Sequence, residues 1–185
     1  MCDKPRRNHT LNPNTTEEKY MKRTISVLVE NKAGVISRVS GLFARRGFNI
    51  NSLAVGETED PAISRMTIVS EGDEHTIEQV EKQLNKMIDT LKIKLLEDGS
   101  STRRELILIK VEADTSTRGE VIDIARVFGA KVVDISATTL TVEHSDRPER
   151  IDLLVDLLRP YRIQEIARTG TVALEKGCGT IGYKK

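Results

Sequence analysis

The chain has 185 residues, 38% of them hydrophobic and 31% charged, with 29 lysines and arginines against 28 aspartates and glutamates. This charge balance gives no strong attraction to nucleic acid, and no apolar stretch approaches the ~20 residues that span a bilayer. We therefore expect a folded cytoplasmic protein with no nucleic-acid or membrane partner, built as one ordinary domain or two small ones.

The first 20 residues show no periodic apolar pattern and contain prolines, asparagines and threonines. Such a composition is typical of a disordered extension. Met21 directly precedes the first apolar alternation and is a candidate start of the native chain. A basic address peptide is the alternative, which Asp3, Glu17 and Glu18 disfavour because plastid and mitochondrial addresses are poor in acidic residues.

Strand and helix patterns alternate between residues 21 and 97. They predict, in chain order, a strand from Arg23 with Ile25, Val27 and Val29, a helix with Val35, Val39, Leu42 and Phe43, strands at 48–55 and 64–70, a helix with Ile77, Val80, Leu84 and Met87, and a strand with Leu91, Ile93 and Leu95. The turn at 56–61 has the length and the proline of a hairpin loop. The order is βαββαβ.

The same order begins again after a polar, Gly- and Ser-rich stretch at 98–103. The patterns predict, in chain order, a strand at 106–111, a helix with Val121, Ile124, Ala125 and Phe128, strands at 131–136 and 139–143, a helix with Ile151, Leu154, Val155 and Leu158 that Pro160 ends, a strand at 162–168, and a short addition at 172–174. We expect a disordered extension at 1–20, domains at 21–97 and 98–176, and a flexible tail at 177–185.

Each unit is expected to have an α+β, ferredoxin-like fold, with an antiparallel four-stranded sheet and both helices on one face, because each helix has one apolar stripe to bury. The first strand of each unit carries apolar residues on both faces. Leu28 alternates with Val27 and Val29, and Leu106 is followed by Ile107. An apolar second face favours association between units, so we expect a homodimer.

The first strand-to-helix turn, around Asn31 and Gly34, is the most informative segment for function. Free backbone N–H groups and the helix dipole favour a carboxylate at a helix start, and Gly34 has no Cβ to block its approach. Asn31 can both accept and donate hydrogen bonds, so it suits a free amino acid. The alternative is structural: Asn31 caps the helix and Gly34 only makes the turn.

A second segment, Arg45 to Leu53, has features that are structural first. Gly47 is placed to end the helix, the last turn carries cations, and Asn49 enters the next strand. Asn49 gains a functional interpretation only if a neighbouring subunit brings it close to the turn at Asn31.

The residues at these positions resemble the acetolactate synthase small subunits. The matching runs are Glu30-Asn31-x-x-Gly34-Val35-x-Ser37-Arg38-Val39, Gly41-Leu42-Phe43-x-x-Arg46-Gly47-Phe48-Asn49-Ile50-x-Ser52-Leu53-x-Val55, Ser64-Arg65-Met66-Thr67, Glu81-Lys82-Gln83-Leu84-x-Lys86, Arg104-Glu105-Leu106, Val133-Asp134-Ile135 and Glu165-Ile166-Ala167-Arg168-Thr169-Gly170. The first four runs are similar to the family's ACT domain and the others to its C-terminal domain. The resemblance covers residues 21 to 175.

The resemblance implies a non-catalytic regulatory subunit that binds and activates a separate catalytic large subunit and mediates feedback inhibition by valine or another branched-chain amino acid. Thiamine diphosphate, magnesium and FAD are then expected on the catalytic subunit, with no cofactor, metal or catalytic residue in this chain. The effector is expected between two N-terminal domains. Its contacts would be Asn31, Gly34, Val35 and Ile36 from one subunit, and Asn49 and Ile50 from the other.

The second domain departs from this pattern at the equivalent turn, 113–119, which has no Asn-x-x-Gly. Asp114 would place a negative charge where a carboxylate would approach, and two such charges repel at short range. We predict no effector at this turn, and a role for the second domain in contacting the catalytic subunit or stabilising the dimer.

Other classes of function fit less well. RNA-recognition domains share the βαββαβ order but stack bases on sheet aromatics, whereas aromatics make up 3% of this chain. An independent enzyme is disfavoured because His9, His75 and His144 are scattered, and we interpret each as a solvated surface residue. Cys2 and Cys178 lack metal-ligand spacing. A free-standing ACT-domain sensor that regulates another protein is the nearest alternative.

Overall fold

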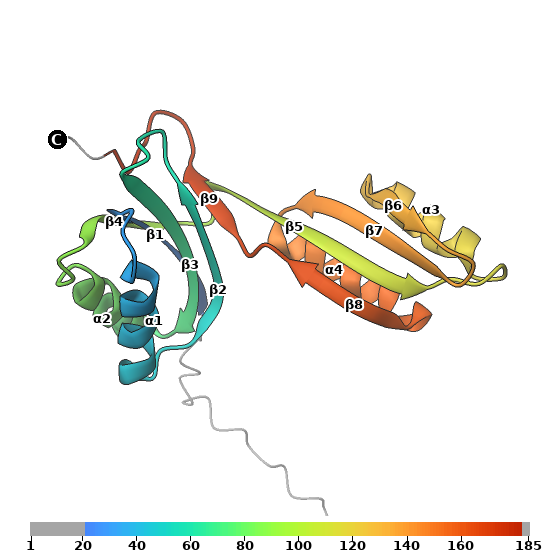
Figure 1. Ribbon diagram of the computed structural model, residues 1–185, viewed down its shortest axis with the longest axis horizontal. Coiled ribbons are helices and arrows are strands. Elements are labelled where there is room, and N and C mark those ends of the chain that lie inside the picture. Colours follow the sequence, from blue (N-terminus) through green and yellow to red (C-terminus); the bar gives the residue numbers. More distant parts are fainter. Residues whose placement is uncertain (1–20, 183–185) are drawn as a thin grey trace, which may run out of the picture.

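The computed structural model describes residues 21–182 (Figure 1), so the expected extension at 1–20 and the end of the expected tail lie outside the described residues. The first unit consists of β1 (Met21–Glu30), α1 (Val35–Arg46), β2 (Ile50–Glu57), β3 (Ile63–Gly72), α2 (Glu74–Leu84) and β4 (Thr90–Leu96). Its antiparallel sheet has the strand order β2-β3-β1-β4. The predicted βαββαβ order of this unit is confirmed.

The second unit consists of β5 (Ser101–Glu112), α3 (Arg118–Phe128), β6 (Lys131–Ile135), β7 (Thr139–Asp146), α4 (Pro148–Leu158), a 3-10 turn (Arg159–Tyr161), β8 (Ile163–Arg168) and β9 (Val172–Glu175). Four of its strands repeat the arrangement of the first unit, in the order β6-β7-β5-β8. Helix α4 ends just before Pro160, as predicted from the missing N–H.

Both helices of each unit pack on one face of its sheet, which confirms the prediction from their single apolar stripes. The first core holds Ile25, Val27, Val29, Val35, Val39, Leu42, Phe43, Met66, Ile68, Val80 and Leu84. The second core holds Ile107, Ile109, Val111, Ala113, Val121, Ala125, Leu140, Val142, Ile151, Leu154 and Leu158. Two separate cores make this a tandem α+β protein of two ferredoxin-like units.

Met87 lies outside the helix in which the sequence pattern placed it. Helix α2 ends at Leu84, and the N–H of Met87 donates to the carbonyl oxygen of Leu84 at 3.1 Å in a tighter turn. The Met87 side chain still packs against the first core. An apolar residue one turn beyond a helix end can share its stripe, so periodicity alone does not fix the helix end.

Strand β5 joins the two units. It begins at Ser101, before the expected start at Leu106, and its first residues pair with β9 from Ser101–Glu175 to Arg104–Val172. On this two-stranded ribbon Ser101 and Ala173 are buried. Figure 1 shows β9 beside the first unit, although the sequence pattern gave it as an addition to the second.

The segment after β9 also lies against the first unit. Lys94 is paired with Glu175, and Lys92 Nζ donates to the carbonyl oxygen of Gly182 at 3.0 Å. Ile181, within the expected tail at 177–185, is only 4% exposed. Leu28, on the sheet face opposite the helices, is 5% exposed. The chain therefore covers part of the face from which we predicted association between subunits, and the homodimer itself stays a prediction.

None of the helices in the part of the chain that the structure describes has the length and apolar character needed to cross a membrane.

Candidate effector site and the contact between the units

Asn31 ties the strand-to-helix turn to the β2–β3 hairpin. Its Nδ2 donates to the carbonyl oxygen of Pro61 at 2.8 Å and to Glu57 Oε1 at 3.1 Å. The N-cap of α1 is Gly34, and no side chain caps this helix. The interpretation of Asn31 as the helix cap is therefore wrong, because its amide is turned toward the hairpin.

Gly34 is required by the backbone of the turn. Its φ is +83°, a left-handed conformation that side chains with a Cβ rarely adopt, and a Cβ there would lie 3.3 Å from Arg38 Nη1. No acidic residue occupies the first turn of α1. Of the next two residues, Val35 is buried in the first core, whereas Ile36 is 49% exposed. Val35 can therefore offer a ligand only its backbone, while Ile36 can offer an apolar side chain.

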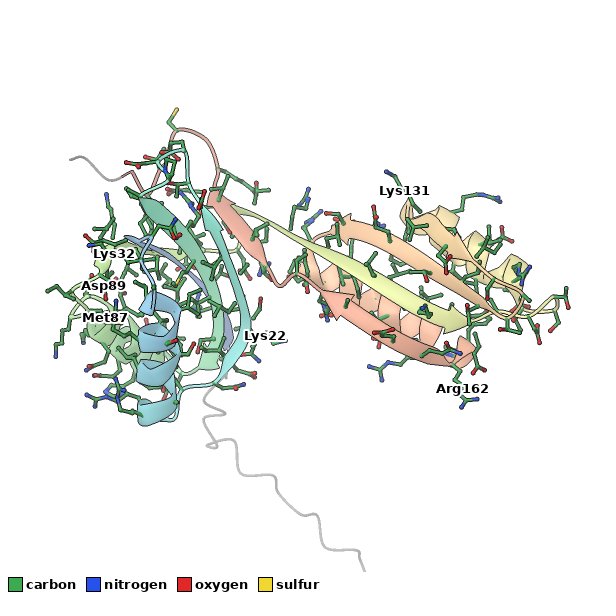
Figure 2. The ribbon with its side chains drawn as sticks, viewed as in Figure 1. Lys22, Lys32, Met87, Asp89, Lys131 and Arg162 are labelled. Carbon is green, nitrogen blue, oxygen red and sulfur yellow. The ribbon has the colours of Figure 1, made fainter. Side chains whose placement is uncertain are left out.

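Arg38 adds a cation that the sequence pattern did not single out. Its Nε lies 2.7 Å from Oδ2 of the buried Asp89, and its other end faces Gly34. Figure 2 labels Lys32 and Asp89 at the end of the first sheet where α1 begins. Its place in the sequence could have identified Arg38, because it follows Gly34 by four residues and residues four apart on a helix are neighbours. An uncapped helix start beside a guanidinium favours a carboxylate.

Asn49 and Ile50 lie at the opposite end of α1. Asn49 is exposed, its carbonyl oxygen accepts from Ser70 Oγ at 2.7 Å, and the partly buried Ile50 begins β2. A helix of this length separates the two halves of the expected site by roughly 18 Å. A free amino acid contacts both halves only if a second chain supplies one of them.

Ser52 connects the first unit to the segment after β8. The N–H of Thr171 donates to Ser52 Oγ at 2.8 Å, across 119 positions of sequence. Gly170 has a φ of +77°, and a Cβ there would lie 2.7 Å from Ser52 Oγ. Both residues line a cleft of about 740 Å³ between the units. No local periodicity signals this contact.

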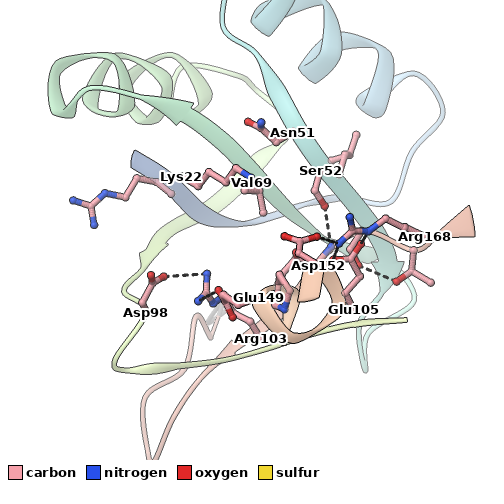
Figure 3. A pocket seen from close by; sticks show the side chains of 16 residues that line it. Lys22, Asn51, Ser52, Val69, Asp98, Arg103, Glu105, Glu149, Asp152 and Arg168 are labelled. Atoms are coloured by element: carbon pink, nitrogen blue, oxygen red, sulfur yellow. Dashed lines mark hydrogen bonds and ion pairs between the residues drawn. The ribbon is translucent and has the colours of Figure 1, made fainter. Parts of the chain in front are cut away.

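On the side of the cleft formed by the second unit, Arg168 binds two carboxylates. Its Nε and Nη2 bind the two carboxylate oxygens of the buried Glu105 at 2.6 and 3.1 Å, and Nη2 lies 2.9 Å from Asp152 Oδ1 (Figure 3). Burial opposes the charge, but these hydrogen bonds outweigh it and raise the pKa of Arg168. Two of the sequence runs that match the small-subunit family, one containing Glu105 and the other Arg168, therefore meet in one ion-pair cluster.

Two family models match the chain in succession: an AHAS small subunit-like ACT domain over residues 25–92, and the small subunit of acetolactate synthase over residues 104–177. The acetolactate synthase small subunit of Mycolicibacterium smegmatis is 52% identical over 162 residues, which cover 88% of this chain and 95% of that protein. The chain belongs to the acetolactate synthase small-subunit family. The probable acetolactate synthase small subunit of Archaeoglobus fulgidus is 51% identical over 85% of this chain and 98% of its own length.

The small-subunit fold is also shared with a solved structure. The crystal structure of the acetolactate synthase small subunit from Thermotoga maritima superimposes with a TM-score of 0.78 at 38% sequence identity, covering 85% of this chain and 98% of that one. The tandem arrangement of an ACT unit and a second βαββαβ unit is therefore a property of the small-subunit family, and the resemblance drawn from the sequence is confirmed.

The equivalent turn in the second unit of this small-subunit chain is filled by its own carboxylate. Asp114 Oδ1 accepts the backbone N–H groups of Ser116 and Thr117 at 2.8 and 3.0 Å, and both hydroxyls. These hydrogen bonds, that of the Ser116 side chain first, lower the pKa of Asp114 from 3.8 to about 2. The Asp114 carboxylate thus stands at the turn just before α3, where its negative charge would repel a carboxylate ligand. The absence of an effector from this turn stays a prediction.

The stability contributed by Asp114 is expected to depend on pH. Because the pKa in the folded chain lies below that of the unfolded chain, the contribution is complete above about pH 4 and is lost as the pH falls toward about 2. The difference in melting temperature between the wild type and Asp114→Ala should shrink over this interval. Thermal unfolding at a series of pH values measures it, and a constant difference down to pH 2 would contradict the assigned hydrogen bonds.

The histidines give a mixed outcome. His75 is exposed, as expected, and His9 lies outside the described residues. His144 is 7% exposed, so the prediction of a solvated residue is wrong for it. It shares a face of β7 with Leu140 and Val142 and stands edge-on to the ring of Phe128, with 6.1 Å between ring centroids. Among residues 21–182, no three His, Cys, Asp or Glu side chains are grouped to hold a metal ion.

Proposed function

We propose that this chain binds and activates the catalytic large subunit of acetolactate synthase and gives it feedback inhibition by a branched-chain amino acid, valine in the first place. The observation that carries the proposal is the similarity to acetolactate synthase small subunits over nearly their whole length, at 52% identity for one of them. The regulatory form is a cytoplasmic homodimer, and thiamine diphosphate, magnesium and FAD belong to the catalytic subunit.

The geometry of the first turn supports an amino-acid effector. The start of α1 offers uncapped N–H groups and the nearby guanidinium of Arg38 to a carboxylate. The carboxylate of Glu57, held by Asn31, lies on the hairpin side of the same turn and suits an ammonium group. The exposed Ile36 suits a branched aliphatic side chain, and Ile50 of a second chain would complete an apolar surround.

Enzyme assays test this proposal directly. Acetolactate formation by the matched catalytic subunit is measured with and without this chain, and then with increasing valine or leucine. We expect several-fold activation, and inhibition by valine that requires this chain. Activation without inhibition by valine or leucine would remove the effector assignment but keep the partner, whereas no activation of a matched catalytic subunit would return the chain to the wider class of ACT-domain sensors.

A further inference from the structure

Strand β2 carries both an expected effector contact and the contact with the second unit. Ile50 opens the strand, and its pairing with β3 shifts register between Ile50 and Ser52. A bulge of this kind re-aims the following side chain. Ile50 accordingly packs against the first core on the helix side, whereas Ser52 pairs with Val69 and lines the cleft on the other face. One short segment therefore reaches both sites.

The start of β2 is firmly attached to the strand beside it. Ser70 Oγ donates to the carbonyl oxygen of Asn49 at 2.7 Å, and Asn51 Nδ2 donates to Glu71 Oε2 at 3.3 Å. A displacement at Asn49 would reach Ser52 three residues along the same segment, because close-packed elements have low compressibility and transmit strain.

On the other side of the contact, Gly170 and Thr171 pack closely against β2. A Cβ on Gly170 would lie 2.7 Å from Ser52 Oγ and 3.5 Å from the carbonyl oxygen of Leu53, so a side chain at this position would collide with the Ser52 hydroxyl. Thr171 is 4% exposed, and two residues before Gly170, Arg168 binds Asp152 on α4. Figure 3 shows Ser52, Arg168 and Asp152 around this cleft. A shift of β2 would therefore meet the segment at Ser52 and could reach α4 through Arg168.

We infer that the contact of Ser52 with Gly170 and Thr171 is the coupling element that carries effector occupancy at Asn49 and Ile50 to the second unit. This inference rests on the proposed function, since it assigns a route to the proposed inhibition. Ser52 is a positioning residue: it stands beside the expected effector contacts, and its hydroxyl is used by the second unit. The effector shifts the equilibrium between two arrangements of the units through this hydrogen bond.

The test compares Ser52→Ala with Ser52→Thr, which keeps the hydroxyl, and with Ser145→Ala, the same change at an exposed position of β7. Valine inhibition is measured in the holoenzyme, and valine binding by calorimetry on the full small-subunit chain alone. We expect Ser52→Ala to bind valine within about 2-fold of the wild type and to activate normally, but to lose about 2- to 10-fold of the inhibitory coupling, the range of one hydrogen bond. Ser52→Thr and Ser145→Ala should be inhibited like the wild type.

Hydrogen exchange gives a readout that a purely structural role would not move. In the wild-type holoenzyme, valine should change the exchange rate of the peptide containing Thr171, and in Ser52→Ala this response should vanish. Unchanged inhibition in Ser52→Ala, or valine binding lost by the isolated Ser52→Ala chain, would overturn the coupling role. A wild type that neither binds valine nor is inhibited by it would instead refute the proposed effector, so the two failures are distinguishable.

Discussion

Gly34→Asp is expected to abolish valine inhibition while activation of the catalytic subunit persists. The new carboxylate would lie next to Arg38 Nη1, which is 3.3 Å from the Cβ position, and at the uncapped start of α1. It would therefore take the interactions offered to the effector's carboxylate and repel that group. The expected change is the whole inhibitory coupling, about 5- to 150-fold for typical allosteric sites, measured as the ratio of half-inhibitory valine concentrations.

Two further variants separate charge from backbone strain. Gly129→Asp introduces the same residue at φ +69°, with open space around the Cβ position, in the second unit. Both Gly34→Asp and Gly129→Asp should lose ~1–2 kcal/mol of folding stability, because each places a Cβ in a left-handed conformation. Gly129→Asp should nevertheless remain inhibited by valine. Gly34→Ala adds the Cβ without the charge and should be inhibited only partly. Normal valine inhibition of Gly34→Asp would mean that the effector's carboxylate lies elsewhere.

The sequence predicted the elements of each unit because the signals are local. Ile25, Val27 and Val29 alternate along a strand, and Val35 and Val39 mark one helix stripe, so strand and helix follow from periods of 2 and 3.6. The same logic placed Gly34 at the turn, where its φ of +83° requires glycine. It failed for His144, because the predicted strand ended at residue 143, whereas β7 runs to Asp146 and places His144 on the same buried face as Val142.

The arrangement of the two units could not be predicted, because it depends on contacts that no short window contains. The β-rich pattern at 172–174 says that a strand forms, but it does not say that the strand pairs with Ser101–Arg104 beside the first sheet. The bulge between Ile50 and Ser52 has no glycine or proline to announce it. Sequence therefore defines the two sheets, and tertiary packing defines the cleft between them.

Arg168→Met is expected to destabilise the second unit strongly. Glu105 is 6% exposed, and the substitution would leave its carboxylate without the two hydrogen bonds from Arg168. Removing one partner of a buried pair costs about 3–5 kcal/mol, and we expect about 3 kcal/mol because the Arg168 side chain is 36% exposed. The free energy of unfolding is obtained from urea transitions followed by circular dichroism at a fixed chain concentration, since the chain contains no tryptophan.

The matched control is Arg126→Met, which removes an arginine from an exposed pair with Asp123. The side chains of that pair are 76% and 71% exposed, so its loss should change stability by less than about 1 kcal/mol. The double variant Glu105→Leu/Arg168→Met decides the cause. If the cost of Arg168→Met comes from an uncompensated buried carboxylate, replacing both partners with apolar residues should recover most of it. A double variant as unstable as Arg168→Met would instead assign the cost to lost packing of the arginine side chain against the cleft wall.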